Sequence, residues 1–140
     1  MQTASIPQLE LIEGSHESDP RYRWRVAFPV NRSTGTEDTA VVYFELAPGD
    51  RLGTHTDSAE EILYIVAGEG EAELGDERGR VRAGDLAVIP AMVPHAVVNT
   101  GDETLKCVGF FSAGEVTSTF DETLQPFGVA EVTMGAPVPV

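Results

Sequence analysis

Short apolar runs alternate with turn residues along most of the chain. Its 14 Gly and 9 Pro recur between these runs, and no long segment carries an apolar helical stripe bounded by helix caps. This pattern predicts a mainly β protein. The strands that we expect cover residues 8–13, 22–30, 39–46, 61–66, 71–74, 85–90, 95–100 and 104–112.

Turn signals separate these expected strands. Pro and Gly, which supply the backbone angles of tight turns, combine with Asp or Asn in the segments 47–50, 75–79, 83–85 and 99–102. The stretch 114–128 loses strict alternation, and residues 135–140 are expected to form an extended tail. Eight or so strands favour an all-β closed barrel or double-sheet roll. We expect residues 1–140 to form one domain.

The charge balance limits the kinds of partner. Nine Lys and Arg against 23 Asp and Glu give a formal net charge of -14, which repels nucleic acid backbones and anionic membrane surfaces. We therefore expect a small-molecule ligand, and neither nucleic acid nor a membrane as a partner. Solubility alone is a sufficient reason for such acidity.

Cysteine usage and the first residues bear on the compartment. The single cysteine, Cys107, excludes an intrachain disulfide. The start of the chain has neither the basic residues nor the continuous apolar stretch of a secretory signal, so we expect a cytoplasmic protein. Strand parity places Cys107 with Leu105 and Phe111, which predicts a buried, unreactive thiol.

The first candidate for chemistry is a short segment that contains His55, Asp57 and Glu61. In an extended strand alternate side chains share a face, so His55 and Asp57 can point at the same ion. Glu61 opens an apolar run, where parity places it with Leu63 and Ile65. A carboxylate among such neighbours is costly unless it is bound to something.

The second candidate is His95, which opens another apolar run after a proline turn. Two histidines and two carboxylates in one small β fold can close on a single ion. These nitrogen and oxygen donors suit a divalent transition metal, namely Fe, Mn, Ni, Co, Zn or Cu, and the absence of thiolates argues against a structural zinc site.

Both segments resemble the paired signature motifs of the cupin superfamily, in particular those of small single-domain members (monocupins). The first motif is Gly, five residues, His-x-His, three or four residues, Glu, six residues and Gly, and the second is Gly, five residues, Pro-x-Gly, two residues, His, three residues and Asn. Asp57 stands in place of the second His and Met92 in place of the glycine after the proline. The matching residues are Gly49, His55, Glu61, Gly68, Gly84, Pro90, His95 and Asn99.

The resemblance, which covers residues 39–111, implies a double-stranded β-helix, often dimeric through its outer sheet. It implies His55, Glu61 and His95 as metal ligands, and we expect Asp57 as a fourth. Asp57 could instead act as a base or cap backbone amides in an exposed turn. In that case His55, Glu61 and His95 would still form a two-His-one-carboxylate set.

These observations favour a metal-dependent enzyme. The resemblance makes a mononuclear non-haem oxygenase, a dioxygenase-like oxidoreductase with Fe(II) or Mn(II), the first choice. Asp57 and Glu61 are its candidate catalytic groups, and an apolar pocket is expected. The residues expected to line this pocket are Leu63, Ile65 and Val97.

Other functions remain open. An isomerase, lyase, decarboxylase or cyclase would need no different ligands. A binding module that senses or stores a small molecule would carry a structural metal or none. A metal-free, epimerase-like cupin would require Tyr43 or Tyr64 to face the pocket. We expect Glu60 to face solvent and His16 to lie in a polar loop, and a homodimer is the expected assembly.

Overall fold

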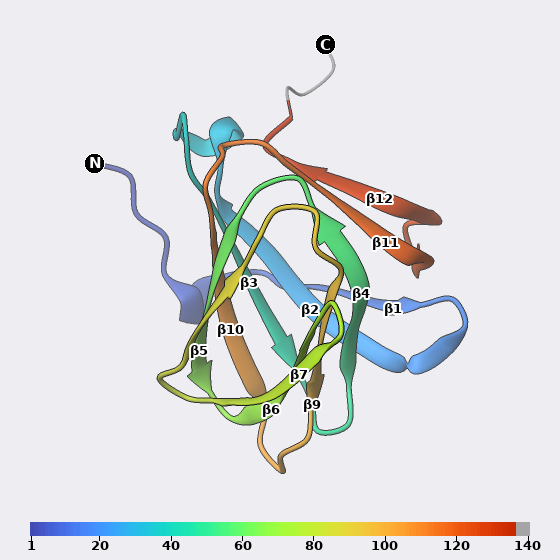
Figure 1. The fold of residues 1–140 in the computed structure, drawn as a ribbon. Coiled ribbons are helices and arrows are strands. Elements are labelled where there is room, and N and C mark those ends of the chain that lie inside the picture. Colours follow the sequence, from blue (N-terminus) through green and yellow to red (C-terminus); the bar gives the residue numbers. More distant parts are fainter. Residues whose placement is uncertain (137–140) are drawn as a thin grey trace.

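The computed structural model describes residues 1–136, and these residues form strands and two short 3-10 helices (Figure 1). None of the described helices is long and apolar enough to cross a membrane. The elements are η1 (Ile6–Gln8), β1 (Ile12–His16), β2 (Asp19–Val30), η2 (Arg32–Thr34), β3 (Ala40–Leu46), β4 (Arg51–Asp57), β5 (Glu61–Ala67), β6 (Glu69–Leu74), β7 (Glu77–Arg82), β8 (Leu86–Ile89), β9 (His95–Asn99), β10 (Leu105–Phe111), β11 (Val116–Gln125) and β12 (Val129–Met134).

All the strand pairs are antiparallel and belong to one sheet that curls on itself. Its strand order is β7-β6-β9-β4-β11-β1-β2-β3-β10-β5-β8, and β12 pairs with β11 outside this path. The many crossovers bring strands that are distant in sequence side by side, such as β4 with β9 and β11. The prediction of an all-β barrel of the double-stranded β-helix type is confirmed.

The core lies between the two halves of the curled sheet. Cys107 is fully buried there, and Leu105 and Phe111 on the same strand are also buried, as the sequence predicted. Large apolar side chains contribute about 1.5–3 kcal/mol each when fully buried. The main cluster consists of Trp24, Phe44, Leu46, Leu63, Ile65, Val81, Ile89, Val97, Leu105, Cys107 and Leu124.

Four differences separate the predicted strands from the observed ones. The strand expected over 8–13 is displaced, because η1 ends at Gln8 and β1 runs from Ile12 to His16. The strands β4, β7 and the β11–β12 hairpin were not among those expected. In β7 only Val81 is buried, so this strand shows no apolar alternation. The expected tail lies mostly outside the described residues, which end at Ala136.

Candidate metal centre

Three strands position the candidate metal ligands. His55 is paired with His95 between β4 and β9, and on the other side of β4 the residues His55 and Asp57 are paired with Phe120 and Ser118 of β11. Gly53, His55 and Asp57 are all buried, whereas the residues between them are partly exposed. The period of two along an extended strand therefore turns both ligand side chains inward.

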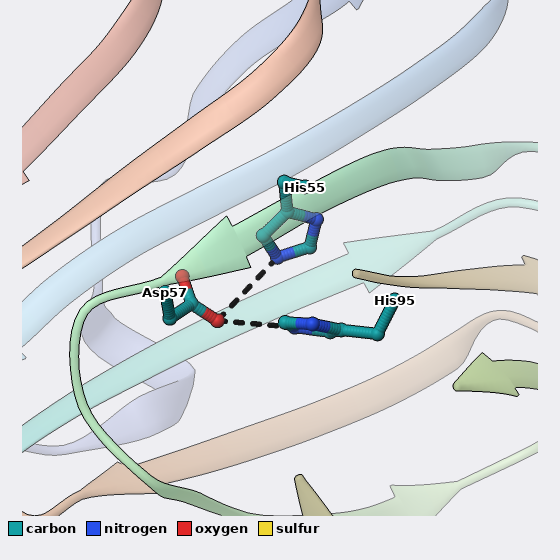
Figure 2. A group of neighbouring side chains, drawn as sticks. All are labelled: His55, Asp57 and His95. Carbon is teal, nitrogen blue, oxygen red and sulfur yellow. Dashed lines mark ion pairs between the residues drawn. The ribbon is translucent and has the colours of Figure 1, made fainter. Parts of the chain in front are cut away.

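The side chains of His55, Asp57 and His95 converge on one point (Figure 2). Oδ2 of Asp57 lies 3.0 Å from Nε2 of His95 and 3.7 Å from Nε2 of His55. One ligand atom from each residue lies within 4.8 Å of the other two, and all three residues are buried. This spacing fits three ligands of one metal ion.

Backbone carbonyls orient both imidazole rings. Nδ1 of His55 lies 2.8 Å from the carbonyl oxygen of Gly53, and Nδ1 of His95 lies 2.9 Å from that of Val93. Because a carbonyl oxygen can only accept, each Nδ1 must carry the proton. Each neutral ring then presents the lone pair of Nε2 to the cluster, which is the arrangement found around metal-bound histidines.

Two facing atoms of the cluster need a cation or a proton between them. Oδ2 of Asp57 and Nε2 of His95 are two of the three buried side-chain atoms in residues 1–136 that lack a hydrogen-bond partner. Buried polar atoms are normally paired, since leaving them unpaired is costly. The other oxygen of Asp57, Oδ1, accepts a hydrogen bond from Oγ of Ser118 over 2.5 Å. A cation bound between Oδ2 and the two Nε2 atoms would satisfy them.

Burial and mutual charge shift the pKa values of the three residues. Burial and the nearby His95 lower the pKa of His55 to about 4. Burial alone would raise the pKa of Asp57, but the hydrogen bonds from His95 and Ser118 and the nearby His55 together lower it. Burial alone would lower the pKa of His95, but its interactions with Asp57, the Val93 carbonyl and Glu61 together raise it. Near neutral pH, Asp57 therefore carries the negative charge that a cation requires.

Glu61 lies at the side of this cluster. It is 4% exposed, and its Oε1 is 3.7 Å from Nε2 of His95, but it is not one of the three residues that meet the common distance limit. Burial, followed by the charge of Asp57, raises the pKa of Glu61 to about 8. A Cβ atom at Gly109 would collide with Oε2 of Glu61, so this glycine makes room for the carboxyl group.

The cluster lies in the wall of a cavity of about 330 Å³. Leu63 and Val97 line this cavity, as the sequence predicted, whereas Ile65 does not. The expectation for Ile65 is wrong, because its fully buried side chain packs in the core cluster instead. Neither Tyr43 nor Tyr64 lines the cavity. The hydroxyl group of Tyr43 donates to Glu45, and Tyr64 is partly exposed, which removes the support for a metal-free, epimerase-like site.

The expectation that His16 lies in a polar loop is also wrong. His16 ends β1, is 3% exposed, and its Nε2 accepts a hydrogen bond from the backbone N–H of Gly53 over 2.9 Å. Burial lowers its pKa. His16 is thus a structural residue that supports β4 next to His55. Glu60 is exposed, as expected.

Ser118 and Phe120 are site residues that the sequence analysis missed. Both line the cavity, and the ring of Phe120 stacks on that of His55 with centroids 4.4 Å apart. Val116, Ser118 and Phe120 occupy every second position of β11. This alternation was the only sequence pattern that could have predicted an inward-facing strand here, and it is weak because Ser118 is itself polar.

Comparisons with known proteins agree with this fold. A family model described as "Cupin domain" matches residues 42–113. Over 81 residues the chain is 35% identical to 3-hydroxyanthranilate 3,4-dioxygenase from Bacillus thuringiensis, covering 51% of this chain and 45% of that protein. It is 37% identical over 62 residues to protein SchB from Streptomyces halstedii, covering 44% and 45% of the two chains. The chain spans less than half the length of these curated relatives.

Two solved structures share the fold at lower identity. A predicted oxalate decarboxylase from Thermotoga maritima has a TM-score of 0.67 at 19% identity, covering 80% of this chain and 99% of that chain. The polyketide cyclase RemF from Streptomyces resistomycificus has a TM-score of 0.65 at 17% identity, covering 79% and 78%. Several chemistries are thus found on this fold.

Proposed function

The chain belongs to the cupin family, and we propose that it is a metal-dependent enzyme that acts on a small molecule bound in the cavity beside His55, Asp57 and His95. Among metal-dependent reactions, mononuclear non-haem oxygenase chemistry is the first choice. The native ion in this proposal is Fe(II) or Mn(II), since two imidazoles and a carboxylate are the ligand set of non-haem iron oxygenases.

One observation carries the proposal: Oδ2 of Asp57 lies 3.0 Å from Nε2 of His95 and 3.7 Å from Nε2 of His55 inside a buried cluster. Burying unpaired charged or polar atoms costs several kcal/mol if nothing compensates (about 1–3 kcal/mol for each neutral group). In addition, both histidines already have their Nδ1 protons engaged. Two imidazole nitrogens and a carboxylate oxygen that converge in this way suit a metal ion, and without the ion a proton on Nε2 of His95 would pair with Oδ2 of Asp57.

Different residues would have different roles at such a site. His55, Asp57 and His95 would hold the ion, which when bound polarises a substrate oxygen or binds dioxygen. Glu61, from the side of His95, would add a ligand oxygen or hold a proton at its carboxyl group beside the substrate, because burial raises its pKa to about 8. The apolar wall that includes Leu63 and Phe120 would exclude water.

The similarity to a dioxygenase supports the oxygenase choice. The same residues could equally serve an isomerase, lyase, decarboxylase or cyclase, and the structures that share this fold include a cyclase and a predicted decarboxylase. Oxygen consumption separates these classes, since only the oxygenase consumes dioxygen with its substrate.

The first test is metal content, measured by plasma mass spectrometry on untagged protein purified without added metal. We expect near-stoichiometric iron or manganese in the unaltered protein and its loss in His95→Ala. His16→Gln is the matched control, because His16 is a buried histidine outside the cluster, and it should retain the metal. Absence of metal, even after anaerobic loading with Fe(II), Mn(II) or Zn(II), would refute the proposal.

The second test is oxygen uptake by the Fe(II)-loaded protein with 2-aminophenol as the first probe. It is the ring of 3-hydroxyanthranilate without the carboxylate, and it is chosen from the similarity to the dioxygenase. Uptake that depends on both the probe and His95 would support the oxygenase. A metal-loaded protein that consumes no oxygen with this or other phenolic probes would shift the proposal to non-oxidative chemistry on the same metal.

A further inference from the structure

The cavity beside the candidate metal cluster is lined mostly by apolar side chains. Apart from the cluster residues, Glu61, Ser118 and Glu131, its lining side chains are apolar. Six of them are aromatic: Trp24, Phe28, Phe44, Phe111, Phe120 and Phe127. At about 330 Å³, the cavity is at the lower end of the range of small-molecule sites, which is about 300–1,000 Å³.

No Lys or Arg side chain lines this cavity. All nine Lys and Arg of the chain lie within the described residues, and none of them is part of the lining. Several pair with carboxylates elsewhere, as Arg25 does with Glu45 and Arg51 with Glu73. The acidic residues that line the cavity are Asp57, Glu61 and Glu131. A phosphate or a second carboxylate on the substrate would therefore be buried without a partner, which is costly.

The aromatic side chains extend from the cluster to the surface. Phe120 stacks on His55 next to the candidate ligands, and Phe127 stacks on Trp24 with centroids 6.1 Å apart. The cavity opens where its lining residues are exposed, since Ile12 is 43%, Phe127 44% and Val129 46% exposed. A flat ring system entering there meets aromatic surfaces up to the cluster, and such contacts favour stacking.

We infer that the substrate is a small aromatic molecule that bears one oxygen donor toward His55, Asp57 and His95 and carries no further anionic group. This inference rests on the proposed function and names the substrate class of the same site. It excludes sugar phosphates and short dicarboxylates as substrates, because these require cationic side chains that the cavity lacks.

The test uses four probes on Co(II)-loaded protein: 2-naphthol, 6-hydroxynaphthalene-2-sulfonate, oxalate and glucose 6-phosphate. Calorimetry measures affinity, and the visible absorption of Co(II) reports an oxygen that reaches the ion. We expect 2-naphthol to bind and to change the Co(II) spectrum. The other three probes should bind about tenfold more weakly or worse, because each brings a charge that the wall leaves unpaired.

A matched pair of variants tests the cause of this selectivity. Val129→Arg places a cation in the exposed part of the cavity wall, whereas Val88→Arg places it on an exposed β8 residue that is not part of the lining. Val129→Arg should strengthen the binding of 6-hydroxynaphthalene-2-sulfonate about tenfold relative to that of 2-naphthol, and high salt should reduce the gain. Val88→Arg should change neither affinity.

Two results would overturn the inference while leaving the metal site intact. One is stoichiometric Co(II) binding with no affinity for 2-naphthol. The other is binding of oxalate or glucose 6-phosphate as tight as that of 2-naphthol. Failure to bind Co(II) at all would instead refute the proposed function, so the two failures are distinguishable.

Discussion

The hydroxyl group of Ser118 donates a hydrogen bond to Oδ1 of Asp57 over 2.5 Å and leaves Oδ2 to face the two imidazoles. Ser118 lies on β11 opposite Asp57 of β4, 61 residues away in sequence. The pairing of these two strands thus sets the orientation of the carboxylate. Ser118 is a positioning residue for the candidate metal centre.

Removing this hydroxyl group should weaken metal binding without abolishing it. Loss of such an outer partner of a metal ligand typically costs about 10–100-fold in affinity, and we expect this range for Ser118→Ala, with partial recovery in Ser118→Thr. Competition with a fluorescent chelator measures the affinity for Mn(II) or Zn(II). Thr119→Ala is the control, because Thr119 is exposed on the same strand. Equal affinities in all the variants would contradict the positioning role.

The two buried carboxylates should contribute unequally to metal affinity. Oδ2 of Asp57 approaches both histidine Nε2 atoms, whereas Oε1 of Glu61 has an ion-pair distance only to His95. We expect Asp57→Asn to lower the affinity by more than about 100-fold, and Glu61→Gln by about tenfold or less. Calorimetric titration of the two metal-free variants compares them directly. A greater loss in Glu61→Gln would make Glu61, not Asp57, the principal carboxylate ligand.

The thiol of Cys107 should be inert in the folded protein. Burial, followed by the negative charge of Glu61, raises its pKa to about 12, so the reactive thiolate is scarce at neutral pH. Ellman's reagent at pH 8 should find no reactive thiol under native conditions and one thiol per chain in urea. Rapid reaction of the native protein would show that the core around Cys107 opens readily.

Sequence periodicity predicted those site residues that depend on strand parity alone. His55 with Asp57, and Glu61 with Leu63, share buried faces, because side chains in a strand alternate whatever the topology. Ile65 shows the limit of parity, since the position along β5 at which the cavity ends depends on the curvature of the sheet. Ser118 depends on the pairing of β11 with β4, which local patterns do not encode.

Some expectations stay predictions. The cytoplasmic location depends on the cell. The homodimer depends on a second chain, and the identity of the metal depends on the ion that the protein binds. His16 shows another limit of local reasoning. Its flanking residues Ser15 and Glu17 are polar and suggested a loop, yet the imidazole is buried against Gly53 of β4.

His16 should make stability depend on pH. Burial lowers its pKa below the ordinary 6.5; the charge of Glu122 opposes this shift and that of Arg51 adds to it. Protonation would also remove the lone pair with which Nε2 accepts the hydrogen bond of Gly53. The unfolded chain, whose histidine has a pKa of about 6.5, therefore binds more protons than the folded protein. The contribution of His16 to stability is therefore full above about pH 6.5 and is lost as the pH falls below that value.

The measurement is urea unfolding of metal-free protein at pH 7.5, 6.5 and 5.5, with His16→Gln as the comparison. Gln can still accept the hydrogen bond from Gly53 but does not titrate, and both proteins share every other titrating group. We expect the unaltered protein to lose more stability than His16→Gln as the pH falls, so that the difference between their free energies of unfolding shifts in favour of the variant. Parallel pH profiles would show that protonation of His16 does not change the free energy of unfolding in this range.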